Sequence, residues 1–136
     1  MDVIRIIPLS LFILCTVANA NAEQHCINDA CLVSHKAVFA CNEAECTVDV
    51  NFTLKPDSKA VYMFAEVICA ADIEGISPDG REIRRYYGVS NTILRPQTEQ
   101  YGDLEVRVKV VNPDQELSLF QHQCRLKDAY PLLNYM

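Results

Sequence analysis

Residues Leu104–Val110 read Leu-Glu-Val-Arg-Val-Lys-Val, an unbroken alternation of aliphatic and charged side chains. A period of two is typical of a β-strand with one face toward a core and the other toward water. The segment Asn112–Gln115 follows, and its residue types favour a turn. A second apolar-rich stretch, Glu116–Leu126, comes after it. The sequence therefore predicts a β-hairpin with arms at 104–110 and 116–126.

The same alternation occurs earlier in the chain, over Cys46–Leu54, where every second residue is apolar. The run Ala60–Asp72 is instead apolar on both sides of the alternation and rich in β-branched and aromatic residues, which favours a central strand. Turn residues occupy Gly75–Gly80. Two further strands are expected at Arg81–Val89 and Ser90–Arg95.

These elements predict an all-β domain. About seven strands are expected over residues 37–126, without a helix or an internal repeat. This pattern favours a disulfide-braced, antiparallel β-sandwich of immunoglobulin-like or fibronectin-like type. The stretch Leu94–Tyr101 resembles the corner of such domains, in which a tyrosine hydroxyl bonds to upstream backbone. A bulge at Gly102 would then correct the register of the strand that follows.

Residues 1–22 have the organisation of a cleaved signal peptide. Arg5 supplies a cation near the start, an apolar run follows over Ile6–Ala18, and small-x-small cleavage patterns end at Ala20 and Ala22. The apolar run is too short for the ~30 Å hydrocarbon core of a membrane. We therefore expect a secreted or periplasmic protein with no membrane span in its mature chain. Its expected regions are a disulfide-rich N-terminal segment at 23–36, the β-sandwich domain at 37–127 and a C-terminal tail at 128–136.

The cysteine count agrees with export. The chain has seven cysteines, and removal of residues 1–22 takes away Cys15 and leaves an even number. An even count in a small exported domain indicates a disulfide framework, although six cysteines allow fifteen pairings. The pairing that we prefer joins Cys26 to Cys31, Cys41 to Cys46 and Cys69 to Cys124.

The composition argues against several classes of protein. The chain has 12 basic and 18 acidic side chains and a net charge of −6, whereas binding to nucleic-acid phosphates needs a basic surface. Its four glycines are scattered, so no loop is suited to holding phosphate, and no G-x-S-x-G nucleophile motif is present. We expect a protein that is not an enzyme and that needs no cofactor.

One cluster contains the residue types of a metal site. His25, Cys26, Cys31 and His35 form an H-C-x4-C-x3-H pattern, and both residue types are ligands of zinc and copper. In an oxidising compartment these cysteines would form disulfides instead. We favour the disulfide interpretation and expect no metal site.

A basic and aromatic cluster is the best candidate for binding another protein. Its members are Arg81, Arg84, Arg85, Tyr86 and Tyr87. Arginine and tyrosine are enriched among residues that contribute most of an interface's energy. The alternative is a solvated edge strand whose charges prevent edge-to-edge aggregation. The acidic segment Glu43–Asp49 is a second candidate, either for attracting a basic ligand or as a solvated loop.

The predicted terminal hairpin resembles the last hairpin of small periplasmic curli-assembly proteins. The resemblance rests on Leu104–Val111, the Asn112–Gln115 turn and Leu117–Gln123, with a looser similarity over Ser90–Pro96. It implies an immunoglobulin-like sandwich that restrains the amyloid growth of curli subunits. This chain departs from the family in its cysteines. Some members carry a C-x-C pair in a central strand, where this chain has only Cys69, and four of its exported cysteines precede residue 47.

These observations lead to a main functional hypothesis and an alternative. The main hypothesis is an exported β-sandwich that binds another protein, such as an amyloid subunit, a hydrolase or a surface receptor. Its specific form is a chaperone-like inhibitor of amyloid assembly, with Arg84, Arg85 and Tyr86 as the expected contact face. The alternative is a hydrolase inhibitor, or a host- or surface-interaction module, that uses the loop braced by Cys41 and Cys46. Such a rigid loop would lose little entropy on binding.

Overall fold

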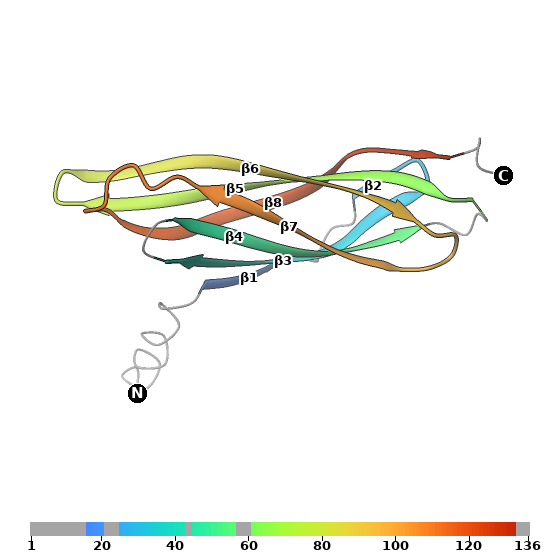
Figure 1. Cartoon of the computed structure of the whole chain (residues 1–136), viewed down its shortest axis with the longest axis horizontal. Helices are drawn as coiled ribbons and strands as arrows, with labels where there is room; N and C mark the ends of the chain where they lie inside the picture. The colour runs from blue at the N-terminus through green and yellow to red at the C-terminus, as the bar shows by residue number, and fades with distance from the viewer. Residues whose placement is uncertain (1–15, 21–24, 43–44, 57–60, 133–136) are drawn as a thin grey trace, which may run out of the picture.

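The computed structural model describes residues 16–20, 25–42, 45–56 and 61–132. In this part of the chain eight antiparallel strands and no helix form two facing sheets (Figure 1). Sheet A has the order β1-β3-β4-β7, with β2 also paired to β3, and sheet B has the order β6-β5-β8. The strands are β1 (Thr16–Ala20), β2 (His25–Ile27), β3 (Ala30–Cys41), β4 (Cys46–Pro56), β5 (Met63–Ser77), β6 (Gly80–Leu94), β7 (Gln100–Val108) and β8 (Glu116–Pro131). The prediction of an all-β protein with two antiparallel sheets is confirmed.

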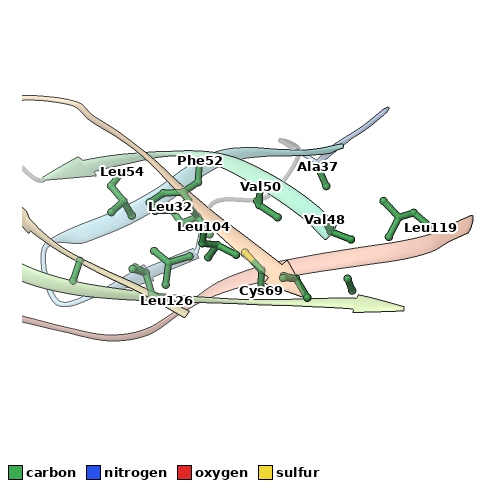
Figure 2. Close-up of a cluster of buried hydrophobic side chains, with 14 of the residues drawn as sticks. Leu32, Ala37, Val48, Val50, Phe52, Leu54, Cys69, Leu104, Leu119 and Leu126 are labelled. Carbon is green, nitrogen blue, oxygen red and sulfur yellow. The ribbon is translucent and has the colours of Figure 1, made fainter. Parts of the chain in front are cut away.

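The two alternating stretches form the inner surface of sheet A. Val50 of β4 lies opposite Ala37 of β3 and Leu104 of β7, and all three are buried. Figure 2 shows the side chains of β4 directed toward the layer that carries Cys69 and Leu126. Burial of one such aliphatic side chain contributes roughly 1.5–3 kcal/mol. The period of two in the sequence therefore identified the core-facing residues of both strands.

Strand β5 is the centre of sheet B, as its apolar run predicts. It pairs with β6 on one side and β8 on the other. The prediction of two separate strands between residues 81 and 95 is wrong, because β6 pairs with β5 continuously from Gly80 to Leu94. Residues 88–90 contain no turn and simply continue the ladder. The tight turn at its start is completed by Gly80, whose φ of 137° favours glycine.

The predicted hairpin between 104 and 126 is also wrong. β7 pairs with β4 in sheet A, whereas β8 pairs with β5 in sheet B. The turn itself is present, since the N–H of Gln115 donates to the carbonyl of Asn112 at 3.1 Å. The connection that contains it passes from one sheet to the other (Figure 1). Alternation specifies which face of a strand is buried, but it does not specify the neighbouring strand.

Tyr101 does not form the predicted corner. Its side chain is 72% exposed, and its hydroxyl donates to Glu99 at 3.0 Å rather than to upstream backbone. The expected bulge at Gly102 is absent, because β4 and β7 stay in register from Leu54 to Cys46. Gly102 lies opposite Phe52, and a Cβ there would come within 2.6 Å of the phenyl ring. Glycine is therefore needed here for a close approach and not for a bulge.

All three preferred disulfides are present. Cys26–Cys31 joins β2 to β3, Cys41–Cys46 joins β3 to β4, and Cys69–Cys124 joins β5 to β8. In each case the two cysteines are directly opposite in the antiparallel ladder. The last bridge lies inside sheet B, and Cys69 is fully buried. The expected disulfide framework is confirmed.

The strands extend across two of the expected regional boundaries. β3 begins at Ala30 and so contributes part of 23–36 to sheet A, and β8 continues to Pro131, within the expected tail. Within the expected signal peptide, β1 is described, whereas residues 1–15 and 21–24 lie outside the described residues, as do 133–136. Among the described residues, no helix is long and apolar enough to cross a membrane.

Candidate functional site

The five residues of the predicted binding cluster lie on two different sides of β6. Leu94 of β6 is buried opposite Met63, which sets the even-numbered positions of β6 toward sheet A. Arg81, Arg85 and Tyr87 therefore face outward, while Arg84 and Tyr86 face inward. Tyr86 packs against the core, and its hydroxyl donates to the carbonyl of Lys109 at 3.3 Å. The structure does not bring Arg84, Arg85 and Tyr86 together as one contact face.

Each arginine of this cluster has an acidic partner. The pairs are Arg81 with Glu74, Arg84 with Glu82 at 3.1 Å and Arg85 with Asp72 at 2.7 Å. Arg81 also lies over the ring of Phe120, with its guanidinium carbon 5.5 Å from the ring centre. The cluster is therefore a set of neutralised pairs rather than an unpaired basic patch.

Asp72 is the centre of a hydrogen-bonded network that spans sheet B. Its carboxylate accepts two hydrogen bonds from Arg85 of β6, from Nε at 2.7 Å and from Nη2 at 3.0 Å. It also accepts one from the amide of Gln121 of β8 at 2.7 Å. Asp72 is only 6% exposed, so its carboxylate has lost most of its water. The hydrogen bonds from Arg85 and Gln121 replace the hydrogen bonds to that water.

The pKa values of the two ions follow from this geometry. The hydrogen bonds from Arg85, with a smaller contribution from Gln121, lower the pKa of Asp72 although burial opposes the shift. The same bonds from Arg85 raise its own pKa, mainly through Asp72. The pair therefore remains ionised and fixed in position at neutral pH.

Around this network, the outward surface of sheet B combines apolar side chains with charged and amide side chains. Seven of its large apolar side chains are exposed: Ile76, Ile83, Tyr87, Val89, Ile93, Phe120 and Tyr130. At one end, Ile93, Phe64 and Tyr130 lie opposite one another across the three strands, and the rings of Phe64 and Tyr130 stack at 5.0 Å. We call this surface, with Asp72 and Arg85 at its centre, the outer face of sheet B.

The cluster considered from the sequence covered only part of this face. It missed Asp72 and the apolar side chains supplied by β5 and β8. A signal was nevertheless present, because Ala60–Asp72 is apolar on both sides of its alternation. Such a strand is expected to be covered on both faces. Among the described residues, sheet A covers one face of β5, and Phe64 and Ile68 on its other face are partly exposed.

The members of the H-C-x4-C-x3-H pattern take part in separate interactions. Cys26 and Cys31 form a disulfide, and His25 accepts a hydrogen bond at Nδ1 from the N–H of Leu126 at 3.0 Å. His35 instead contacts His122, with Nδ1 and Nε2 separated by 3.0 Å. Within the described ranges, no group of three or more histidine, cysteine, aspartate or glutamate side chains is arranged to hold a metal ion.

The two histidines connect the sheets at the side where β3 and β8 approach. His35 belongs to sheet A and His122 to sheet B, and both are partly buried. Burial, and to a smaller degree the charge of His122, lowers the pKa of His35 to about 4. Burial also lowers the pKa of His122. Both rings are therefore neutral at pH 7.

The disulfide-braced loop is a short connection between β3 and β4. The N–H of Asn42 donates to the carbonyl of Glu45 at 2.9 Å, and the N–H of Glu45 donates back to the side chain of Asn42 at 3.0 Å. Residues 43 and 44 lie outside the described residues. Asp49 is exposed on the outer face of sheet A.

Comparison of the chain with protein-family models, with curated proteins and with solved structures gives no match.

Proposed function

We propose that this chain is an exported, non-enzymatic module that binds another protein through the outer face of sheet B. The single observation that carries the proposal is the concentration of exposed Tyr87, Ile93, Phe120 and their apolar neighbours on that face. Exposed apolar surfaces of this kind mark sites of protein association. The three disulfides are consistent with an oxidising compartment outside the cytoplasm.

The physical basis of binding is removal of apolar surface from water on a preformed platform. The face belongs to strands that are fixed by ladder bonds and by the Cys69–Cys124 bridge, so few backbone degrees of freedom are lost on association. Aromatic side chains such as Tyr87 supply large contact areas with little rotamer entropy. The Arg85–Asp72 pair adds polar groups whose orientation is already set.

The partner that we propose is an amyloid-forming subunit of the curli type, and the fold that we propose is immunoglobulin-like. The partner follows from the sequence resemblance, and the fold from the number of short strands and the turn signals between them. The hairpin that carries most of the resemblance belongs to two sheets in this chain. A platform of apolar β-strands suits contact with early amyloid assemblies, which present extended strands and apolar side chains. Transient contacts of this type would delay nucleation without consuming the inhibitor.

The test is fibril growth of a curli-type subunit, followed by dye fluorescence, with the mature protein added at a small fraction of the subunit concentration. We expect a longer delay before growth and no stable complex on size-exclusion chromatography. Ile93→Ser should shorten this delay toward that of the subunit alone. Val111→Ser is the matched control, because Val111 is also about half exposed but lies outside the face.

Two outcomes would count against the proposal. An unchanged growth curve with the wild-type protein would remove amyloid restraint. Equal losses in the Ile93→Ser and Val111→Ser proteins would show that the outer face of sheet B is not the contact surface.

A further inference from the structure

One edge of sheet A is covered by a segment that export would remove. β1 pairs antiparallel with β3 over five residues, from Thr16 opposite Phe39 to Ala20 opposite His35. β1 lies entirely within the predicted signal peptide, and both cleavage patterns end at or after its last residue. Cleavage after Ala20 or Ala22 would therefore take away the whole of β1.

Without β1, no other described strand would pair with this part of the edge of β3. β3 remains paired with β4 continuously from Ser34 to Cys41, so its backbone stays extended. β2 pairs only with residues 30–32 of β3, and a register shift separates them from Ser34. Residues 35–39 contain no proline and a single charged side chain, Lys36, which is little protection against addition of a further strand.

We infer that residues 35–39 of β3 form a strand-accepting edge in the mature protein, which takes up an extended segment of a protein partner in antiparallel orientation. This inference rests on the proposed export. It concerns a surface separate from the outer face of sheet B. Backbone hydrogen bonds along the edge would supply affinity, and the side chains opposite β3 would set specificity, as in other cases of strand addition.

The chain itself indicates the chemistry of the segment that fits. β1 reads Thr-Val-Ala-Asn-Ala, which is uncharged and free of proline, and Ala18 lies opposite the buried Ala37. β1 also contacts β8, so the occupant lies where the two sheets approach. The site therefore suits one extended, neutral segment with small residues at alternate positions. The edge of a second folded copy would bring its own sheet to this position, so we assign the site to an extended segment.

The probe is a synthetic peptide of residues 16–22, Thr-Val-Ala-Asn-Ala-Asn-Ala, with blocked ends. The mature protein is recovered after export, its first residue is determined by intact mass, and amide hydrogen exchange is measured with and without saturating peptide. We expect alternate amides within 35–39 to exchange at least about tenfold more slowly with the peptide. A peptide carrying Asn19→Pro, which lacks one backbone donor, should give the amides of 35–39 no such protection. Amides of the β6 edge serve as the internal control.

The outcomes distinguish failure of the export proposal from failure of the inference that residues 35–39 accept a strand. If the recovered protein retains residues 16–20, the export proposal fails and the edge is already filled. If the chain begins at Asn21 or Glu23 and the peptide protects none of residues 35–39, the edge inference is overturned while export stands. Protection without peptide, together with a dimeric mass in solution, would also overturn it, because the occupant would then be a second copy.

Discussion

Sheet A and sheet B bury the same kind of aliphatic side chain but differ on their outer faces. On sheet A, β4 presents Thr47, Asp49 and Asn51, and β7 presents Glu105 and Arg107. On sheet B, the corresponding surface carries seven exposed large apolar side chains beside its ion pairs, and the buried carboxylate of Asp72 is paired with Arg85. This difference is the basis of our proposal that the outer face of sheet B binds a partner.

The largest expected difference between the sheets is in their disulfides. Cys69–Cys124 closes a 55-residue separation in sheet B, whereas Cys41–Cys46 closes one of only five in sheet A. Loop entropy gives about 4 kcal/mol for the first and about 2 kcal/mol for the second. We expect the Cys69→Ala/Cys124→Ala protein to lose about twice as much unfolding free energy in urea as the Cys41→Ala/Cys46→Ala protein. Equal losses would contradict this ranking.

The next largest effect is on stability where β6 of sheet B approaches β7 of sheet A. A Cβ at Gly88 of β6 would lie 2.8 Å from the backbone oxygen of Glu105 in β7. Because backbone cannot easily move aside, Gly88→Ala should cost about 1–3 kcal/mol. Gly75→Ala is the control, since its nearest neighbour is the flexible side chain of Gln115 at 2.9 Å. Thermal unfolding of both proteins measures the difference, and a milder effect at Gly88 than at Gly75 would refute the close approach.

The ion pairs of the two outer faces should also differ. Asp72→Asn removes the charge beneath Arg85 and leaves poorly matched partners in a buried site, which should cost about 1–2 kcal/mol. Glu105→Gln breaks the exposed pair with Arg107 on sheet A and should cost less than about 0.5 kcal/mol. Chemical denaturation of the two variants provides the comparison. Similar values for both would mean that the Asp72 network contributes no more than a surface pair.

A smaller, pH-dependent effect is expected where His35 of sheet A meets His122 of sheet B. The folded pKa of His35 is lowered from 6.5 to about 4, so the unfolded chain takes up the proton first as the pH falls. The stabilising contribution of neutral His35 to the unfolding free energy is complete above pH 6.5, and it is lost progressively as the pH falls toward 4. His35→Gln should flatten the decline of unfolding free energy across this window. Asp72→Asn should not, because the lowered pKa of Asp72 places its own titration below 3.8. An unchanged slope in the His35 variant would refute this assignment.

The core of both sheets could be predicted because alternation directly reports burial. The stretches at Cys46–Leu54 and Leu104–Val108 have the expected inner faces, and the preferred disulfides join residues that lie directly opposite in the ladders. The neighbouring strand could not be predicted in the same way. A turn at Asn112–Gln115 is compatible with a hairpin and equally with a connection between sheets, and only the tertiary pairing of β7 with β4 decides between them.

The candidate site was harder to predict for a related reason. Arg84 and Arg85 are adjacent in sequence, but the pleat of β6 separates them onto opposite sides. The acids that neutralise the outward-facing Arg81 and Arg85 lie on β5, at register positions fixed only by folding. A run that is apolar on both sides of its alternation, such as Ala60–Asp72, is the sequence sign of the apolar side chains on this outer face.

The most direct test of the central claim compares one exposed tyrosine from each sheet. Tyr87 is 60% exposed on sheet B and Tyr101 is 72% exposed on sheet A, so Tyr→Ser at either position should change stability by less than about 0.5 kcal/mol. The measurement is the delay that each mature protein imposes on fibril growth of a curli-type subunit. Our account predicts that Tyr87→Ser loses at least half of the wild-type delay and that Tyr101→Ser keeps it. Equal delays in the two variants, or no delay with the wild-type protein, would contradict it.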